Sequence, residues 1–123
     1  MIFKDKLYQI QNVEINEGAI AAIIDLDPLH EIYSGHFPGN PITPGVVQLE
    51  IVKEVLSAHF NDSFLLKTVK NSKYLAVLNP VDNSTVTVNI RFEFIDDKNL
   101  NVSGDISSGE IVFMKFQCSY SKP

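Results

Sequence analysis

The sequence has few of the residues that form disulfides and metal centres, and it has no long apolar run. Among its 123 residues are one cysteine, three histidines and no tryptophan. A single cysteine excludes an intrachain disulfide, and Cys118 falls among alternating apolar residues, which favours a buried structural thiol. The longest apolar run, residues 19 to 26, is too short to cross a bilayer, and the first residues lack the apolar stretch of a secretory signal. We therefore expect a cytoplasmic protein with no contact to a membrane.

Positive charge is also scarce. Ten basic residues stand against fifteen acidic ones, and the net charge is −5. This balance argues against broad binding to nucleic acid or to an anionic membrane. The one concentration of cations is Lys67, Lys70 and Lys73, at three-residue spacing, and we interpret it as the solvated edge of a strand or loop. An acidic partner would have to bind at such a local cluster.

What is present predicts one domain over residues 1–123, since 45% hydrophobic and 20% charged residues suit a single core in a chain of this length. Thr43 is a favoured N-cap and Pro44 suits a first helical position, so a helix should begin there and continue to about His59. Pro and Gly restrict residues 27 to 43 to an ordered loop with a helical turn around residues 29 to 33. Alternating apolar residues and turn signals predict strands at residues 7 to 15, 18 to 26, 64 to 78, 84 to 95, 99 to 106 and 110 to 120.

The predicted helix is apolar around more than half of its circumference, so it should be enclosed by other elements. The remaining narrow arc carries Glu50, Lys53, Glu54 and Ser57. Together these patterns predict an α+β fold, in which an antiparallel sheet of about six strands wraps around one central helix.

Three residues around the start of this helix offer distinct chemical groups. His36 lies on the proline-rich loop, and an imidazole can take or give a proton near neutral pH. The N–H of Gly45, in the first helical turn, has no intrahelical acceptor and can stabilise an oxyanion or enolate. Glu50 can serve as an acid if it is partly desolvated. This set suits removal of the proton alpha to a thioester carbonyl with loss of a beta-hydroxyl.

Simpler interpretations of both side chains stay open at this point. Glu50 could belong to a solvated arc with Lys53 and Glu54, because helix carboxylates usually do. His36 could be a loop histidine that is tied to the backbone.

The stretch from His36 to Glu50 reads H-F-P-G-N-P-I-T-P-G-V-V-Q-L-E. It resembles the H-F-P-G-x-P-x-x-P-G-V-x-x-x-E signature of the hot-dog-fold 3-hydroxyacyl-acyl-carrier-protein dehydratases. The order of elements around it, two strands before the helix and four after, is also similar to that fold. Residues 75 to 82, LAVLNPVD, resemble the P-V-x-P-G-D stretch of the same family.

The resemblance implies a role for each matching residue. His36 would handle the alpha proton, Glu50 would help the hydroxyl leave as water, and the Gly45 N–H would hold the thioester carbonyl oxygen. It also places Phe37, Gly39 and Val46 among the substrate-binding residues. It implies no metal and no redox cofactor.

The resemblance further implies the substrate and the assembly. The substrate would be a 3-hydroxyacyl chain on the phosphopantetheine of an acyl carrier protein, in fatty-acid or related lipid or polyene biosynthesis. The protein would be a homodimer whose sites each take histidine and carboxylate from different subunits, and assembly beyond the dimer stays open.

The chain also departs from the family pattern. Small residues and a glutamine commonly follow the family's glutamate, whereas Lys53 and Glu54 stand here, and Glu54 would put a second charge near the site. Two alternatives therefore remain: a non-catalytic hot-dog subunit that binds an acyl chain or an active partner, and a hot-dog acyl thioesterase.

Overall fold

The structure, a computed structural model, describes residues 1–123 as a six-stranded antiparallel sheet and two helices. The strands are β1 (Tyr8–Asn16), β2 (Ala19–Leu26), β3 (Leu65–Tyr74), β4 (Thr85–Phe94), β5 (Asn99–Ser108) and β6 (Ile111–Ser121), and the helices are α1 (Ile32–Gly35) and α2 (Gly45–Phe60). Their order in the sheet is β1-β2-β4-β5-β6-β3, so the first strand after α2 lies at the edge opposite to β1.

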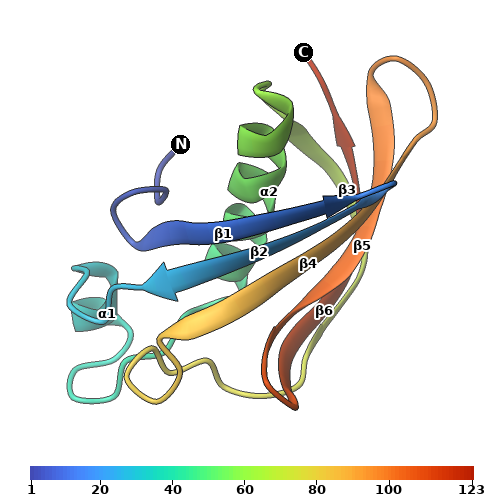
Figure 1. Cartoon of the computed structure of the whole chain (residues 1–123). Coiled ribbons are helices and arrows are strands. Elements are labelled where there is room, and N and C mark those ends of the chain that lie inside the picture. The colour runs from blue at the N-terminus through green and yellow to red at the C-terminus, as the bar shows by residue number, and fades with distance from the viewer.

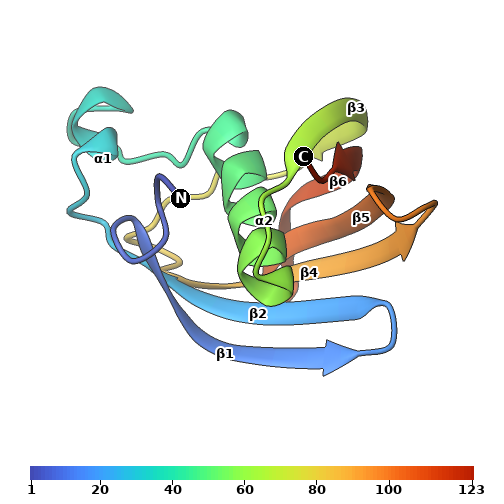
Figure 2. The ribbon, with the colours of Figure 1, turned by 90° about the horizontal axis from the view of Figure 1, so that it is seen from above.

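The sheet curves around α2, which lies against its inner face (Figures 1 and 2). Alternate strand residues point inward, as Val86, Val88 and Ile90 of β4 do, because successive side chains of a strand lie on opposite faces. With Ile51 and Leu56 of α2 they belong to one cluster of 25 buried hydrophobic residues. The predicted α+β fold with an enclosed central helix is confirmed, and it is the hot-dog fold.

Most of the predicted strands are confirmed to within two residues at each end, but the strand expected at residues 64 to 78 stops at Tyr74. The next two amides, of Leu75 and Ala76, both donate to the carbonyl of Phe113 instead of continuing the ladder. The following residues, up to β4, form neither helix nor strand. Among them Leu78 is buried, and this burial explains the apolar pattern that resembled a longer strand.

The start of α2 differs from the prediction. Pro44 and not Thr43 is the N-cap residue, with an extended backbone and no side-chain cap. Thr43 is buried, and its hydroxyl forms a 2.8 Å hydrogen bond with the hydroxyl of Tyr33. Its N–H donates to the carbonyl of Leu78 at 2.8 Å. Thr43 therefore fastens the proline-rich loop to two other segments instead of capping the helix.

The narrow polar arc of α2 is not solvated throughout, because Glu54 is only 1% exposed. Its carboxylate accepts hydrogen bonds from the amides of Ile2, Phe3 and Lys4, at 2.7 to 3.1 Å, and from the hydroxyl of Tyr8 at 3.0 Å. The pKa of Tyr8 is raised above its usual range, mainly because its hydroxyl is buried. The charge of Glu54 and this hydrogen bond raise it further. Glu54 thus holds the N-terminal segment against α2.

Candidate active site

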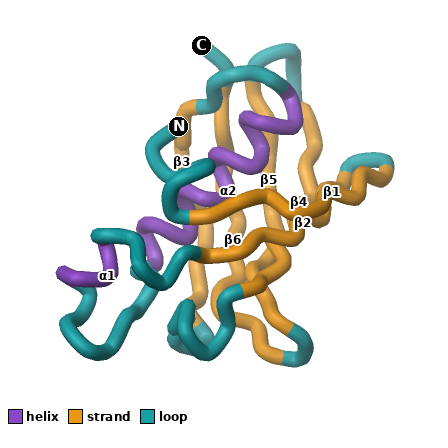
Figure 3. Tube along the Cα trace, turned by 60° about the vertical axis from the view of Figure 1, so that its left-hand side comes forward, coloured by secondary structure: helices purple, strands orange, loops and turns teal.

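His36 lies in the loop that joins α1 to α2, which extends beyond the end of the sheet (Figure 3). A tight turn follows it: the Asn40 N–H donates to the Phe37 carbonyl at 2.8 Å, with Pro38 and Gly39 in the central positions. Gly39 has φ +76°, the value that a type II turn requires at its third residue, where glycine is favoured. The carbonyl of His36 accepts from the Ile42 N–H at 2.7 Å. The backbone of His36 is therefore fixed, while its side chain remains exposed.

The first turn of α2 presents free amide groups. The N–H groups of Val47 and Gln48 both donate to the Pro44 carbonyl, at 3.1 and 3.0 Å, whereas those of Gly45 and Val46 have no acceptor in the chain. They lie at the end of the helix where the peptide dipoles concentrate positive charge. A developing negative charge on a nearby oxygen would be stabilised there.

Tyr74, at the end of β3, covers Gly45. A Cβ atom at Gly45 would overlap the Tyr74 ring and lie 2.6 Å from its hydroxyl oxygen. A residue with a side chain would therefore displace this ring, which is half exposed. The sequence reasoning missed Tyr74, although it directly precedes the stretch at residues 75 to 82 that resembles the family.

Glu50 lies one turn further along α2 and is partly buried. Its carboxylate forms an ion pair with Lys53 at 3.2 Å, and its side chain is 22% exposed. The pKa of Tyr120 is raised above its usual range. Burial of its hydroxyl is the main cause, and the negative charges of the nearby Cys118 and Glu50 add to it. The hydroxyl of Tyr120 and the side-chain oxygen of Gln48 are buried without a hydrogen-bond partner. Unlike Glu54, Glu50 accepts no hydrogen bond from the rest of the chain.

The structure places the six predicted site residues on one stretch of chain but does not join the two proposed acid–base groups. No hydrogen bond or ion pair links His36 to Glu50 within the chain. Phe37 and Val46 are 53% and 75% exposed, so neither lines an enclosed pocket of this chain. The roles given to these residues stay predictions.

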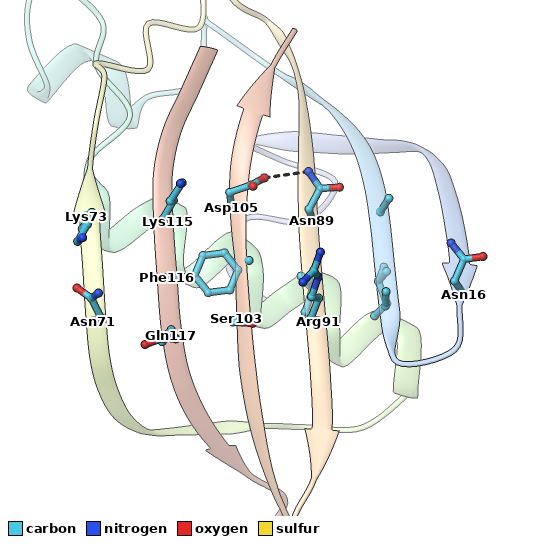
Figure 4. Close-up of a pocket in the computed structure, with 15 residues that line it drawn as sticks. Asn16, Asn71, Lys73, Asn89, Arg91, Ser103, Asp105, Lys115, Phe116 and Gln117 are labelled. Atoms are coloured by element: carbon cyan, nitrogen blue, oxygen red, sulfur yellow. Dashed lines mark hydrogen bonds between the residues drawn. The ribbon is translucent and has the colours of Figure 1, made fainter. Parts of the chain in front are cut away.

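Three further features of the chain lie outside this site. A hollow of about 620 Å³ lies on the sheet face away from α2 and includes none of the six residues (Figure 4). No three His, Cys, Asp or Glu side chains are grouped so that they could hold a metal ion. Neither helix has the length and apolar character needed to cross a membrane.

Known proteins resemble this chain in sequence. A curated relative, the 3-hydroxyacyl-acyl-carrier-protein dehydratase FabZ of Lactobacillus helveticus, is 32% identical over 85 residues, which cover 68% of this chain and 51% of the relative. The FabZ of Pseudoalteromonas translucida is 30% identical over 101 residues, which cover 75% of this chain and 56% of the relative. The chain thus spans about half the length of the curated relatives it matches.

One solved structure and one family profile bear on fold and family. The dehydratase heterocomplex ApeI:P from Xenorhabdus doucetiae superposes with a TM-score of 0.73 at 18% identity, covering 93% of this chain and 97% of that one, which shows the shared fold. The profile of the ApeI-like family, described as ApeI dehydratase, matches residues 11–110. Because this match spans most of the chain, the protein belongs to the ApeI-like dehydratase family, and with it to the hot-dog 3-hydroxyacyl-acyl-carrier-protein dehydratases.

Proposed function

We propose that the protein dehydrates a 3-hydroxyacyl thioester on an acyl carrier protein to the trans-2-enoyl thioester, in fatty-acid or related lipid or polyene biosynthesis. The observation that carries this proposal is the pair of free amides at Gly45 and Val46, at the positive end of α2. Along the chain they follow the fixed loop of His36 and precede Glu50. Membership of the dehydratase family supports it.

The proposed reaction uses three groups. His36 takes the proton from the carbon alpha to the thioester carbonyl, and the carbonyl oxygen, which gains negative charge, accepts a hydrogen bond from the Gly45 N–H. The electron pair of the broken C–H bond then forms the alpha–beta double bond. The bond from the beta-carbon to oxygen breaks, and the hydroxyl leaves as water with a proton from Glu50. Phe37, Gly39 and Val46 would contact the bound substrate.

We further propose that two copies of the chain build each site, His36 coming from one and Glu50 from the other. Two observations support this: the chain does not join these groups itself, and exposed apolar side chains lie nearby. Phe37 and Val46 flank the site, and the unpaired edge strand β3 exposes Leu65, Leu66 and Val69. An unpaired strand edge with apolar side chains is suited to cover by another chain.

A spectrophotometric assay tests the reaction. The purified protein is supplied with a 3-hydroxyacyl thioester, and both the conjugated enoyl product and freed thiol are followed. We expect enoyl formation, reduced about 10²- to 10⁴-fold in His36→Ala and in Glu50→Gln. Thiol release without enoyl product would assign a thioesterase instead, and no turnover of carrier-bound substrates of several lengths would indicate a non-catalytic subunit.

Mixing the two inactive variants tests the shared site. When His36→Ala and Glu50→Gln are unfolded and refolded together, half of the dimers should contain one copy of each. A mixed dimer with shared sites has one site that carries both changes and one site that carries neither, so about a quarter of the wild-type rate should return. If each site were built within one chain, every site would carry one change and no activity would return.

A further inference from the structure

The loop that carries His36 is exposed, and a buried residue lies on either side of it. The loop extends beyond the end of the sheet (Figure 3), and residues 34 to 40 are all exposed. By contrast, Tyr33 is only 4% exposed and Thr43 only 2%. The hydroxyls of these two residues form a hydrogen bond with 2.8 Å between their oxygens. This bond joins the two ends of the loop, and we call it the loop clamp.

Every polar group of Thr43 has a partner in a different part of the chain. Its N–H donates to the carbonyl of Leu78, between β3 and β4, at 2.8 Å. Its carbonyl accepts a hydrogen bond of 3.0 Å from the side-chain amide of Gln48, in α2. Its hydroxyl is bonded to Tyr33, in α1. All four residues are buried, so Thr43 is held relative to three separate segments at once.

Residues 36 to 42, by contrast, form hydrogen bonds only with each other. Phe37 and Asn40 exchange two backbone hydrogen bonds, of 2.9 and 2.8 Å, and the Ile42 N–H donates to the His36 carbonyl at 2.7 Å. These bonds set the shape of the loop but do not attach it to the sheet or to α2. The hydrogen bonds that attach this end of the loop are therefore those of Thr43.

Short and stiff connections link His36 to the first residue of α2. The hydrogen bond from Ile42 ties His36 to the residue directly before Thr43. Thr43 is followed by Pro44, whose ring restricts φ, and then by Gly45 with its free N–H. A displacement of Thr43 would therefore change where His36 lies relative to the start of α2.

We propose that Tyr33 and Thr43 are positioning residues for the reaction, and that the loop clamp fixes His36 relative to the groups of α2 that complete the site. This role rests on the proposed dehydration. Both side chains are buried, so they act on the substrate only through His36. Reacting groups must be held in a narrow range of geometry, and a displacement of about 1 Å can lower a rate about 10²-fold.

Deletion of either hydroxyl tests the clamp. Thr43→Val and Tyr33→Phe each remove one oxygen and leave the side chain close to its original volume. With a small 3-hydroxyacyl thioester, we expect kcat to fall about ten- to a hundredfold in each variant, while KM stays within about twofold. Thr43→Ser keeps the hydroxyl, so its kcat should stay within about threefold of the wild type. Should one deletion variant fail to fold, the other removes the same bond from the opposite side.

A matched control separates positioning from a general loss of stability. Tyr8→Phe also removes a buried tyrosine hydroxyl that forms a hydrogen bond, here of 3.0 Å to Glu54, but it does not touch the loop. Its kcat should stay within about twofold of the wild type. The double variant Tyr33→Phe with Thr43→Val should lose no more activity than either single variant, because both delete one bond. Unchanged kcat in the two single variants, a rise in KM alone, or an equal fall in Tyr8→Phe would overturn the proposal.

Hydrogen exchange separates this outcome from that of the proposed function. The Ile42 N–H, which is bonded to His36, should exchange with deuterium at least tenfold faster in Thr43→Val and Tyr33→Phe, but not in Tyr8→Phe. If the wild type turns over no thioester and Ile42 behaves in this way, the clamp stands and the dehydratase proposal is wrong. If the wild type dehydrates the thioester and neither kcat nor exchange responds to the deletions, only the positioning proposal is wrong.

Discussion

The two glutamates of α2 lie one helical turn apart and have opposite surroundings. The carboxylate of Glu54 is buried and accepts hydrogen bonds from three backbone amides and from Tyr8. The carboxylate of Glu50 is partly exposed, and its one partner within the chain is the ion pair with Lys53. A carboxylate whose acceptor positions are filled by its own chain stabilises the fold. One with positions left free is available to a substrate or to a second chain.

Neighbouring acids of the same type on one helix can therefore have different roles. Position on the helix does not distinguish them, since both belong to the arc that the sequence pattern leaves polar. What distinguishes them is whether other parts of the chain supply donors. The N-terminal segment supplies them to Glu54 and leaves Glu50 without any.

The largest expected effect on stability is that of Glu54→Ala. Removal of this carboxylate leaves the amides of Ile2, Phe3 and Lys4 and the buried hydroxyl of Tyr8 without their acceptor. We expect a loss of about 3 kcal/mol in the free energy of unfolding, measured by urea denaturation. Glu50→Ala is the matched control and should cost less than about 1 kcal/mol, because it breaks only a partly exposed ion pair. Equal costs for the two variants would remove the distinction between these glutamates.

A smaller effect is expected at Gly45, the first residue of α2. Gly45→Ala adds a methyl group that overlaps the Tyr74 ring, so the ring must move. We expect a loss of about 1 to 2 kcal/mol in the free energy of unfolding. In a double-mutant cycle, Gly45→Ala should cost little in a chain that already carries Tyr74→Ala. A cost that persists in the absence of Tyr74 would show that the ring is not the obstacle.

The elements of the fold could be predicted from the sequence because their signals are local. Alternate residues of β4 and β6 are buried, and this period of two is visible in any short window of the chain. The helix could be located because proline ends the preceding loop and an apolar run follows. The position of His36 and Gly45 relative to the helix could be predicted for the same reason.

What could not be predicted depends on residues that are distant in sequence. The donors to Glu54 lie 46 to 52 positions away, in a segment with no pattern that links it to the helix. The hydroxyl of Thr43 finds Tyr33, ten positions earlier, only because the loop between them folds back. The two register shifts of β3 depend on pairing with β6, so they were not visible in the sequence of β3 alone.

Alkaline pH provides a further test of the Glu54 site. The pKa of Tyr8 is raised in the folded protein, so its contribution to stability is complete below pH 10, where tyrosine in an unfolded chain begins to lose its proton. Above pH 10 the unfolded chain releases this proton while the folded chain keeps it, so stability falls as pH rises. Between pH 9 and pH 11, the free energy of unfolding of Tyr8→Phe should fall by about 1 kcal/mol less than that of the wild type. Urea denaturation of both proteins across this pH range measures the difference. If the free energies of unfolding of the two proteins fell in parallel with pH, the loss of stability would not come from the Tyr8 hydroxyl beside Glu54.

The smallest effect is expected at the ion pair of Glu50 itself. Lys53 and Glu50 are three residues apart on the surface of α2, and their side chains are 32% and 22% exposed, so water weakens their attraction. Lys53→Gln should therefore change the free energy of unfolding by less than about 0.5 kcal/mol, and added salt should reduce the difference further. A cost above 1 kcal/mol that salt does not change would mean that the pair is structural. Glu50 would then resemble Glu54, and its carboxylate would no longer be free for a substrate.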